Sequence, residues 1–376
     1  MFVWVLKVAV MVKDVLILLV MFWNLENFFD PFPGNSGIVK NDSIGRVVED
    51  GIQKWKSPSE EEPFTPGGEK FWTWRKFGRK RNDIARTIAL VKEQFKLYPA
   101  LVGVAEVENS LVLEQLTQNT ILAPLGYGFI HNDSPDSRGI DVALLYRKSE
   151  FKPSIIEFIP LKSIVEVIPT REMLYTKGLF RGLDTLHLFV VHWPSKLGGR
   201  EAVSRREEAG KILKKRSDSI IALNPKANVI VMGDFNDDVK EYANSCAGGL
   251  VCMSGYDVEK ENRRGEMMNG KIGYEGGQRS GGVVKSVAMA GTYKYKGVWE
   301  RIDHFFVSPQ LYGDEGVKFL FCKEERSDIF AHPFLLEEDR VYLGYKVRRT
   351  LVGPRYNGGV SDHLPILLKV YGYPFE

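Results

Sequence analysis

The sequence contains little cysteine, and the cysteines that it has form no metal-binding pattern. Cys246, Cys252 and Cys322 are spread over a chain of 376 residues, without the close pairs that hold zinc. An odd number of separated cysteines is typical of free thiols in a reducing compartment. We therefore predict a cytoplasmic protein with free thiols.

Two other signatures are also missing. Lysine and arginine number 51 against 48 aspartates and glutamates, so a net charge of +3 argues neither for nor against nucleic acid. No glycine-rich loop carries the lysine that binds nucleoside triphosphates. The hydrophobic fraction of 44% and the charged fraction of 26% are ordinary for a globular protein, so a core of full size is expected.

No apolar run reaches the roughly 20 residues that a membrane helix needs. The N-terminal segment is apolar except for Lys7, Lys13 and Asp14, and its uninterrupted part runs only from Val15 to Trp23. We predict a buried strand there, preceded by an apolar extension over residues 1–14, and no membrane span. Export by a signal peptide is the alternative, although no small-residue cleavage site follows.

One short apolar run leads directly into polar residues. Val229–Met232 is rich in β-branched residues, which is typical of a strand buried on both faces. We predict that this strand stops at Gly233, where the backbone can turn. Asp234 and Asn236 are two positions apart and so share a face of an extended chain. They would present a carboxylate and an amide at the rim of the sheet, unless Asp234 only caps a turn.

Similar runs predict further strands over Leu101–Ala105, Ile140–Tyr146, Leu186–Val191, Phe305–Val307 and Leu364–Val370. Polar residues flank most of these strands. Four stand where a strand ends, namely Asn24, Glu106, His192 and Asp234, and three stand where one begins, namely Asp303, Asp362 and His363. If the last strands run antiparallel to the earlier ones, ends and beginnings share one rim. All seven groups could then converge.

Helical spacing covers residues 74–95, where apolar side chains recur at steps of three and four. The basic residues Arg75, Lys76, Arg79 and Lys80 lie mostly off this face, and we interpret them as solvated surface. A second helix should follow Ser110, and a third should end near Leu223. The third carries a basic group that a nucleic acid could contact, comprising Arg200, Arg205, Arg206 and the cluster Lys211–Arg216.

Three long segments lack such periodicity. Proline, glycine and charged residues dominate the stretches near 30–70, 240–297 and 309–359. Loops of this length in a compact domain are usually functional or disordered. We therefore predict a single domain over residues 15–376 that carries three insertions.

The candidate residues suit metal-assisted hydrolysis. Carboxylates bind hard, oxygen-seeking cations, and histidines transfer protons or stabilise charge. Glu106 needs a partner because an unpaired charge beside a buried strand is costly. Arg138 precedes the strand at Ile140 and either binds an anion or is a surface arginine. The best-fitting chemistry is hydrolysis of a phosphoester assisted by Mg²⁺ or Mn²⁺.

Six short motifs in order carry a resemblance to a known family. They are Phe22-Trp23-Asn24-Leu25-Glu26-Asn27, Glu106-Val107-Glu108-Asn109, His192-Trp193-Pro194-Ser195, Gly233-Asp234-Phe235-Asn236, Arg301-Ile302-Asp303 and Ser361-Asp362-His363. In this respect the chain resembles the endonuclease/exonuclease/phosphatase superfamily with the deoxyribonuclease I-like fold, and its bacterial branch in particular. The resemblance implies an α/β four-layer sandwich of two packed mixed β-sheets flanked by helices.

The resemblance also implies roles on the metal side of the site. Glu106 would be the principal metal ligand, with Asn24 and Asp362 close to the ion and Asn24 also near the substrate. Asp234 would orient or deprotonate the attacking water, and Asn236 would help to hold that water or a phosphate oxygen.

The remaining roles concern the histidines. His363 would contact the scissile phosphate, with Asp303 orienting its ring. His192 occupies a place that is histidine in the deoxyribonuclease branch, and the division of acid and base between the two histidines stays open. Arg138 would be a substrate contact.

The substrate is the least determined feature. We expect a metal-dependent nuclease acting on DNA or RNA, as a monomer without a stable protein partner. The alternatives are a phosphatase of small phosphoesters, of the phosphoinositide or sphingomyelin type, and a catalytically silent binding protein on the same scaffold.

Overall fold

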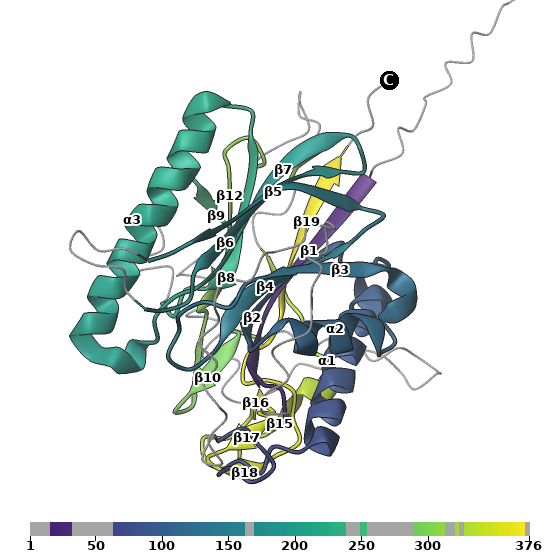
Figure 1. Ribbon diagram of the computed structural model, residues 1–376, viewed down its shortest axis with the longest axis vertical. Helices are drawn as coiled ribbons and strands as arrows, with labels where there is room; N and C mark the ends of the chain where they lie inside the picture. Colours follow the sequence, from purple (N-terminus) through teal and green to yellow (C-terminus); the bar gives the residue numbers. More distant parts are fainter. Residues whose placement is uncertain are drawn as a thin grey trace, which may run out of the picture.

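The computed structural model describes residues 16–31, 63–161, 169–237, 249–253, 289–312, 320–322 and 327–372. Two β-sheets pack face to face, and helices cover both outer faces (Figure 1). The predicted four-layer sandwich is therefore confirmed. The extension over residues 1–14, Cys246 and most of the first two predicted insertions lie outside the described residues.

The first sheet has seven strands in the order β13-β19-β1-β2-β4-β3, with β14 also paired to β19. Their bounds are β1 Leu16–Phe28, β2 Leu101–Val107, β3 Tyr127–His131, β4 Asp141–Arg147, β13 Leu320–Phe321, β14 Asp328–Ile329 and β19 Ile366–Gly372. The central pair β1–β2 is parallel, whereas β19 runs antiparallel to β1. The end of β1 and the beginning of β19 therefore lie at the same rim.

The second sheet has six strands in the order β5-β6-β7-β8-β12-β9. Their bounds are β5 Phe151–Ile159, β6 Met173–Phe180, β7 Asp184–His192, β8 Asn228–Asp234, β9 Val251–Cys252 and β12 Asp303–Val307. Here β7 and β8 are parallel, and β12 runs antiparallel to β8. In both sheets, therefore, the ends of earlier strands and the beginning of a later strand lie at one rim, as the sequence predicted.

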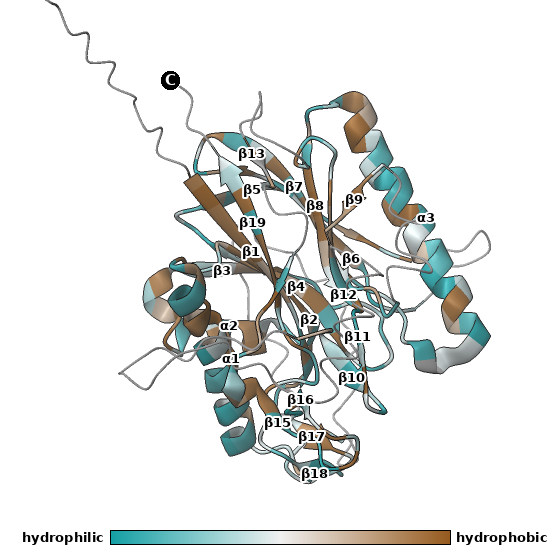
Figure 2. Cartoon of the chain, turned by 180° about the vertical axis from the view of Figure 1, so that it is seen from behind, coloured by the Kyte–Doolittle hydropathy of each residue, from teal (hydrophilic) through white to brown (hydrophobic). Residues whose placement is uncertain are grey.

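Helices α1 (Trp74–Phe95) and α2 (Ser110–Gln118) pack on the outer face of the first sheet, and α3 (Gly199–Leu223) packs on the second. Asn109 caps α2 by accepting from the backbone N–H of Val112 at 3.1 Å. Hydrophobic residues run along β1, while much of α1 is hydrophilic on its outer side (Figure 2). This distribution follows from the 3.6-residue period of a helix that buries one face.

Three short hairpins lie near the end of the sandwich toward which β1, β2 and β8 run (Figure 1). They are β10–β11 (Tyr293–Tyr295 and Val298–Glu300), β15–β16 (Leu336–Glu338 and Tyr345–Val347) and β17–β18 (Leu351–Val352 and Arg355–Tyr356). Single turns of 3₁₀-helix occur at Ala123–Leu125, Lys196–Gly198 and Pro333–Leu335. The last two hairpins belong to the segment predicted as an insertion.

The role predicted for Gly233 is wrong. The strand β8 continues through Gly233 to Asp234, and Gly233 lies opposite Val191 of β7. A Cβ atom at Gly233 would lie 2.3 Å from the carbonyl oxygen of Val191, so close strand packing excludes a side chain there. The turn falls instead at Asn236, which has a left-handed backbone with φ 50°.

Among the described helices, none is long and apolar enough to cross a membrane. Of the described cysteines, Cys252 is partly buried and Cys322 is buried.

Candidate active site

The strand registers of the second sheet bring three candidate side chains into one row. His192 lies opposite Asp234 in the parallel pair β7–β8, and Asp303 lies opposite Asp234 in the antiparallel pair β8–β12. All three residues are buried. The row therefore sits at the rim of the sheet but beneath its solvent-facing surface.

The first sheet brings further candidates to Asp234. The side-chain amide of Asn24 donates to Asp234 Oδ2 over 3.0 Å. His363 Nε2 and His192 Nε2 lie 3.8 Å and 3.7 Å from the same oxygen, and Glu106 Oε1 lies 3.9 Å from His192 Nε2. Asp234 is thus the point at which polar side chains of the two sheets meet.

The two oxygens of Asp234 have different surroundings. Oδ1 accepts from the backbone N–H of Asn236 at 2.9 Å, which closes a turn. Oδ2 faces the site. The turn aims the Asn236 side chain at the carbonyl of Trp193, to which it donates over 2.9 Å. Asp234 therefore closes a turn with one oxygen and contacts another candidate residue, Asn24, with the other.

His363 and Asp303 form a buried pair. His363 Nδ1 lies 2.8 Å from Asp303 Oδ2, and Thr292 Oγ1 donates to the same oxygen over 2.5 Å. Burial by itself would lower the pKa of His363, but the negative charges of Asp303 and Asp234 outweigh it and raise that pKa well above its ordinary value. This raised pKa favours the protonated, imidazolium form of His363.

The pKa of His192 is shifted in the opposite direction. Burial lowers the pKa of His192 well below its ordinary value, and the nearby charges of Arg171 and Arg138 lower it further. The Arg171 guanidinium lies 3.3 Å from His192 Nε2 and also pairs with Asp136 at 3.0 Å. The lowered pKa favours the neutral ring of His192, in contrast to His363, which distinguishes the two histidines that the sequence left equivalent.

Asp234 holds its proton more tightly than an ordinary carboxyl. Burial is the main cause, and the charge of Asp303 adds to it, so that the pKa of Asp234 rises to about 7. Asp234, Asp303 and His363 offer ligand-type atoms that all lie within 4.8 Å of one another. The cluster is therefore rich in negative charge that a cation or a protonated histidine can stabilise.

Glu106 is held by backbone and by an arginine. Its Oε2 accepts from the backbone N–H of Asn27 at 2.9 Å, and the Arg138 guanidinium lies 3.4 Å from both carboxylate oxygens. Arg138 also donates to Asn27 Oδ1 over 2.9 Å. The partner that Glu106 was expected to need is thus a positive charge, and the side chain of Arg138 remains 46% exposed.

Asp362 repeats this arrangement on the other side of the site. Its Oδ2 accepts from Arg349 at 2.8 Å, and its Oδ1 lies 3.9 Å from His363 Nε2. Arg349 is 45% exposed. The two carboxylates predicted to hold a cation therefore each contact a guanidinium at the solvent edge.

The interpretation of Lys80 as solvated surface is wrong. Lys80 is fully buried, and its ammonium donates to the backbone carbonyl of Glu26 and, over 2.6 Å, to Thr350 Oγ1. Helical spacing carried the missed signal, because Lys80 follows Phe77 by three positions and precedes Ile84 by four. It therefore belongs to the buried face of α1.

Glu26 is the second residue that sequence reasoning did not place in the site. Its carboxylate accepts from the backbone N–H of Thr350 at 2.7 Å and lies 3.3 Å from Arg349 Nε. Burial raises the pKa of Glu26 to about 7, and the charge of Asp362 adds to this effect. Glu26 and Asn27 have left-handed backbones with φ 47° and 56°. Lys80 and Thr350 thus hold the turn that presents Asn27 to Glu106.

Arg171 and Tyr293 were also missed. Arg171 is buried beside His192, and the ring of Tyr293 lies 5.0 Å from the ring of His363 between centroids. Arg171 belongs to no motif and to no strong apolar run, so only its position in space associates it with the site.

The basic group of α3 does not extend the site. Arg206 is buried, pairs with Asp237 at 3.4 Å and donates to the carbonyl of Pro194. Other members pair with acids of the same helix, as Lys211 does with Glu208 at 2.7 Å. These cations are therefore largely neutralised on the outer layer of the sandwich.

Comparisons with known proteins bear on the family and the fold of this chain. The family model described as the Endonuclease/Exonuclease/phosphatase family matches residues 46–371. Among solved structures, an endonuclease/exonuclease/phosphatase family protein from Bacteroides thetaiotaomicron matches with a TM-score of 0.52 at 16% identity, covering 96% of this chain and 100% of that one. The curated proteins yield no match.

Two other similar structures have different names. A mannosyl-6-phosphatase from Bacteroides thetaiotaomicron matches with a TM-score of 0.49 at 16% identity, over 94% of this chain and 99% of that one. D. rerio TDP2, complexed with a single-strand DNA product, matches with a TM-score of 0.46 at 16% identity, over 94% and 98%. Similarity at this level does not select a substrate. The match of the family model over most of the chain does identify the family: this protein belongs to the endonuclease/exonuclease/phosphatase family.

Proposed function

We propose that this protein is a divalent-metal-dependent phosphodiesterase that cleaves nucleic acid. The observation that carries the proposal is the meeting of both sheets at Asp234, where His363, His192 and the amide of Asn24 surround one carboxylate. Phosphodiester hydrolysis needs an oriented water, compensation of negative charge and help for the leaving oxygen. The candidate site contains a residue of suitable chemistry for each of these three requirements.

Glu106, Asn24 and Asp362 would hold the cation, as Mg²⁺ or Mn²⁺. Carboxylate and amide oxygens are the ligands that these ions take. Both carboxylates already contact a guanidinium, so positive charge is favourable where the cation would bind. When bound, the cation supplies charge that offsets the negative charge developing on the phosphate.

Asp234 would accept the proton of the attacking water. A pKa of about 7 is suited to a general base near neutral pH. Asn236 and Asn24 flank this carboxylate, and they would help to orient the water or a phosphate oxygen.

His363 would donate a proton to the leaving oxygen, or stabilise the charge on the phosphate. Its raised pKa keeps it protonated, and Asp303 fixes the orientation of its ring. His192 would act as a neutral hydrogen-bonding group, while Arg138 and Arg349 would bind phosphate oxygens at the rim. Each of these two arginines is exposed enough to reach a substrate.

A phosphatase of small phosphoesters is the second candidate. It would use the same residues, and the pairing of the α3 cations with acids favours it, because a nuclease gains affinity from free basic side chains along its groove.

A substrate panel tests the proposal. Plasmid DNA, RNA, phosphoinositides and bis-p-nitrophenyl phosphate are each incubated with and without Mg²⁺ at several ionic strengths. We expect Mg²⁺-dependent cleavage of nucleic acid that weakens steeply with salt. Glu106→Gln should lower kcat/KM by about a hundredfold or more without unfolding the chain. The proposal would be refuted if turnover were the same with and without Mg²⁺ and were also unchanged in Glu106→Gln.

A further inference from the structure

A cleft opens directly from the candidate site on the side of Asp362. Its volume is about 210 Å³, and the lining includes Tyr293, Lys296, Tyr342, Arg349 and Asp362. Asp362 and Arg349 belong to the proposed site, and the ring of Tyr293 contacts His363. A group bound in this cleft would therefore lie next to a phosphate bound at His363.

The cleft is built between two of the short hairpins. Lys294 of β10 pairs with Asp339 at 2.9 Å, at the beginning of the β15–β16 turn, and both side chains are almost fully buried. Lys294 also donates to the carbonyls of Leu343 and Tyr345 at 3.1 Å each. One buried ammonium thus joins the β10–β11 hairpin to both ends of this turn.

The position of Tyr342 is fixed from two sides. Asp339 Oδ1 accepts from its backbone N–H at 3.1 Å. Gly297, with φ +87°, packs so closely that a Cβ there would lie 2.9 Å from the Tyr342 side chain. Gly297 is therefore required both by its backbone conformation and by the ring beside it. The wall of the cleft is preorganised and does not depend on a ligand for its shape.

Apolar surface gathers around this cleft. Val341, Tyr342, Leu343 and Val352 are 77%, 52%, 74% and 52% exposed, although they lie on short, well-braced hairpins. Contiguous exposed apolar side chains in a soluble protein mark a binding surface. Asp339, the acid beside this surface, is paired with Lys294, and among the described residues the contact given for the Lys296 ammonium is the ring of Tyr295 at 5.2 Å. Lys296 therefore supplies a positive charge beside the cleft.

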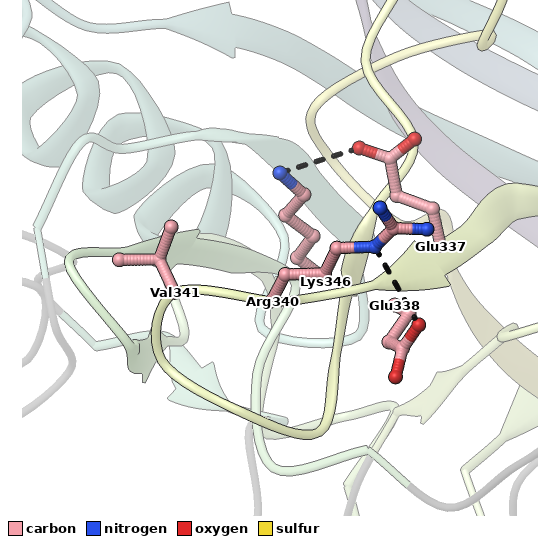
Figure 3. A pocket seen from close by; sticks show the side chains of 5 residues that line it. All are labelled: Glu337, Glu338, Arg340, Val341 and Lys346. Atoms are coloured by element: carbon pink, nitrogen blue, oxygen red, sulfur yellow. Dashed lines mark ion pairs between the residues drawn. The ribbon is translucent and has the colours of Figure 1, made fainter.

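A neighbouring hollow has a different chemistry. It has a volume of about 320 Å³ and is lined by Glu337, Glu338, Arg340, Val341 and Lys346 (Figure 3). Lys346 pairs with Glu337 at 3.3 Å, and Arg340 pairs with Glu338 at 3.8 Å. Its charges are thus mutually neutralised, and no residue of the candidate site lines it. It provides matched control positions.

We propose that the cleft binds the nucleotide next to the scissile phosphate in an unpaired strand. The base would stack on Tyr342, and Lys296 would contact the following phosphate. Aromatic rings bind unpaired bases of any sequence, and cations beside them follow the backbone. This inference rests on the proposed function, which it narrows to single-stranded substrates.

The experiment compares two substrates at saturating Mg²⁺, a single-stranded oligonucleotide and bis-p-nitrophenyl phosphate. Tyr342→Ala and Lys296→Glu should each raise KM for the oligonucleotide about tenfold, with kcat/KM for the small ester unaltered. Tyr345→Ala and Arg340→Glu, both on the β15–β16 hairpin that carries Tyr342, are the matched aromatic and cationic controls and should change neither value. A duplex of the same sequence should be cleaved more slowly than the single strand.

Failure of this inference can be told from failure of the proposed function. If the wild type cleaves the oligonucleotide but the two cleft variants keep its KM within twofold, the cleft is not a subsite. Equal losses on both substrates, or preference for the duplex, would also overturn the inference. If the wild type cleaves only the small ester, the nuclease proposal itself fails, and the cleft assignment fails with it.

Discussion

The two halves of the candidate site, one from each sheet, differ in their exposure to water. In the second sheet the side chains of Asp234 and Asp303 are 2% and 1% exposed, and their neighbours are hydrogen-bonding groups of the protein. In the first sheet Glu106 and Asp362 are 11% and 14% exposed, and each meets an arginine at the solvent edge. Carboxylates therefore occur in two settings in the candidate site, one buried and one near the solvent edge.

This difference in exposure suits the two halves of the candidate site to different tasks. Burial shifts pKa values strongly, so the second-sheet half is suited to holding and transferring protons. A carboxylate near water can exchange one positive partner for another, so the first-sheet half is suited to binding a cation and a phosphate. His363 joins the halves, because it precedes β19 of the first sheet but pairs with Asp303 of the second.

The largest expected effect comes from breaking the buried half. Asp234→Asn removes the proposed base and should lower kcat by about 10³–10⁴-fold, as measured with bis-p-nitrophenyl phosphate at saturating Mg²⁺. Added Mg²⁺ should not restore the rate, whereas Glu106→Gln should mainly increase the Mg²⁺ concentration required. A loss below about tenfold for Asp234→Asn would contradict its role.

An intermediate effect, on stability, is expected for Lys80, which lies next to the first-sheet half of the candidate site. Lys80→Met leaves Glu26 without its buried ammonium neighbour and should lower the free energy of unfolding by about 3 kcal/mol, measured by urea denaturation. The neighbouring Arg79→Met is the control, because the Arg79 side chain is 57% exposed.

The double variant Lys80→Met/Glu26→Gln sharpens this prediction. Neutralising Glu26 should recover part of the lost stability, since an uncharged side chain no longer needs the buried ammonium. Equal free energies of unfolding for Lys80→Met and Arg79→Met would show that the buried Lys80 ammonium does not contribute to stability.

The smallest effect concerns the other end of β7. Burial lowers the pKa of His187 from 6.5 to about 4. Between these values the unfolded chain binds a proton that the folded chain does not, so stability should rise with pH from about 4 to 6.5. Partial exposure keeps the effect small. Urea midpoints at several pH values should give a shallower slope for His187→Gln than for the wild type, and identical slopes would exclude this linkage.

The sequence predicted much of this fold because strands that are buried on both faces need continuous apolar runs. Val229–Met232 and Leu101–Ala105 form strands as expected, each extended by two or three residues at its ends. The hairpin β5–β6 was not predicted. Strand β5 lies at an edge and mixes exposed and partly buried residues, so it carries no continuous apolar signal. The short hairpins around the cleft lack such a signal for the same reason.

The residue pattern by itself determined which polar groups stand at strand ends, because apolar runs and the residues that terminate them are local features. Only the tertiary structure decided which of these groups share a partner and what charge each carries. Registers between strands far apart in sequence set Asp234 against Asp303. The charges of Asp303 and Asp234 then raise the pKa of His363, whereas burial lowers the pKa of His192. Lys80, Arg171 and the braced Tyr342 depend on the same long-range packing, since burial and distance are properties of space and not of sequence order.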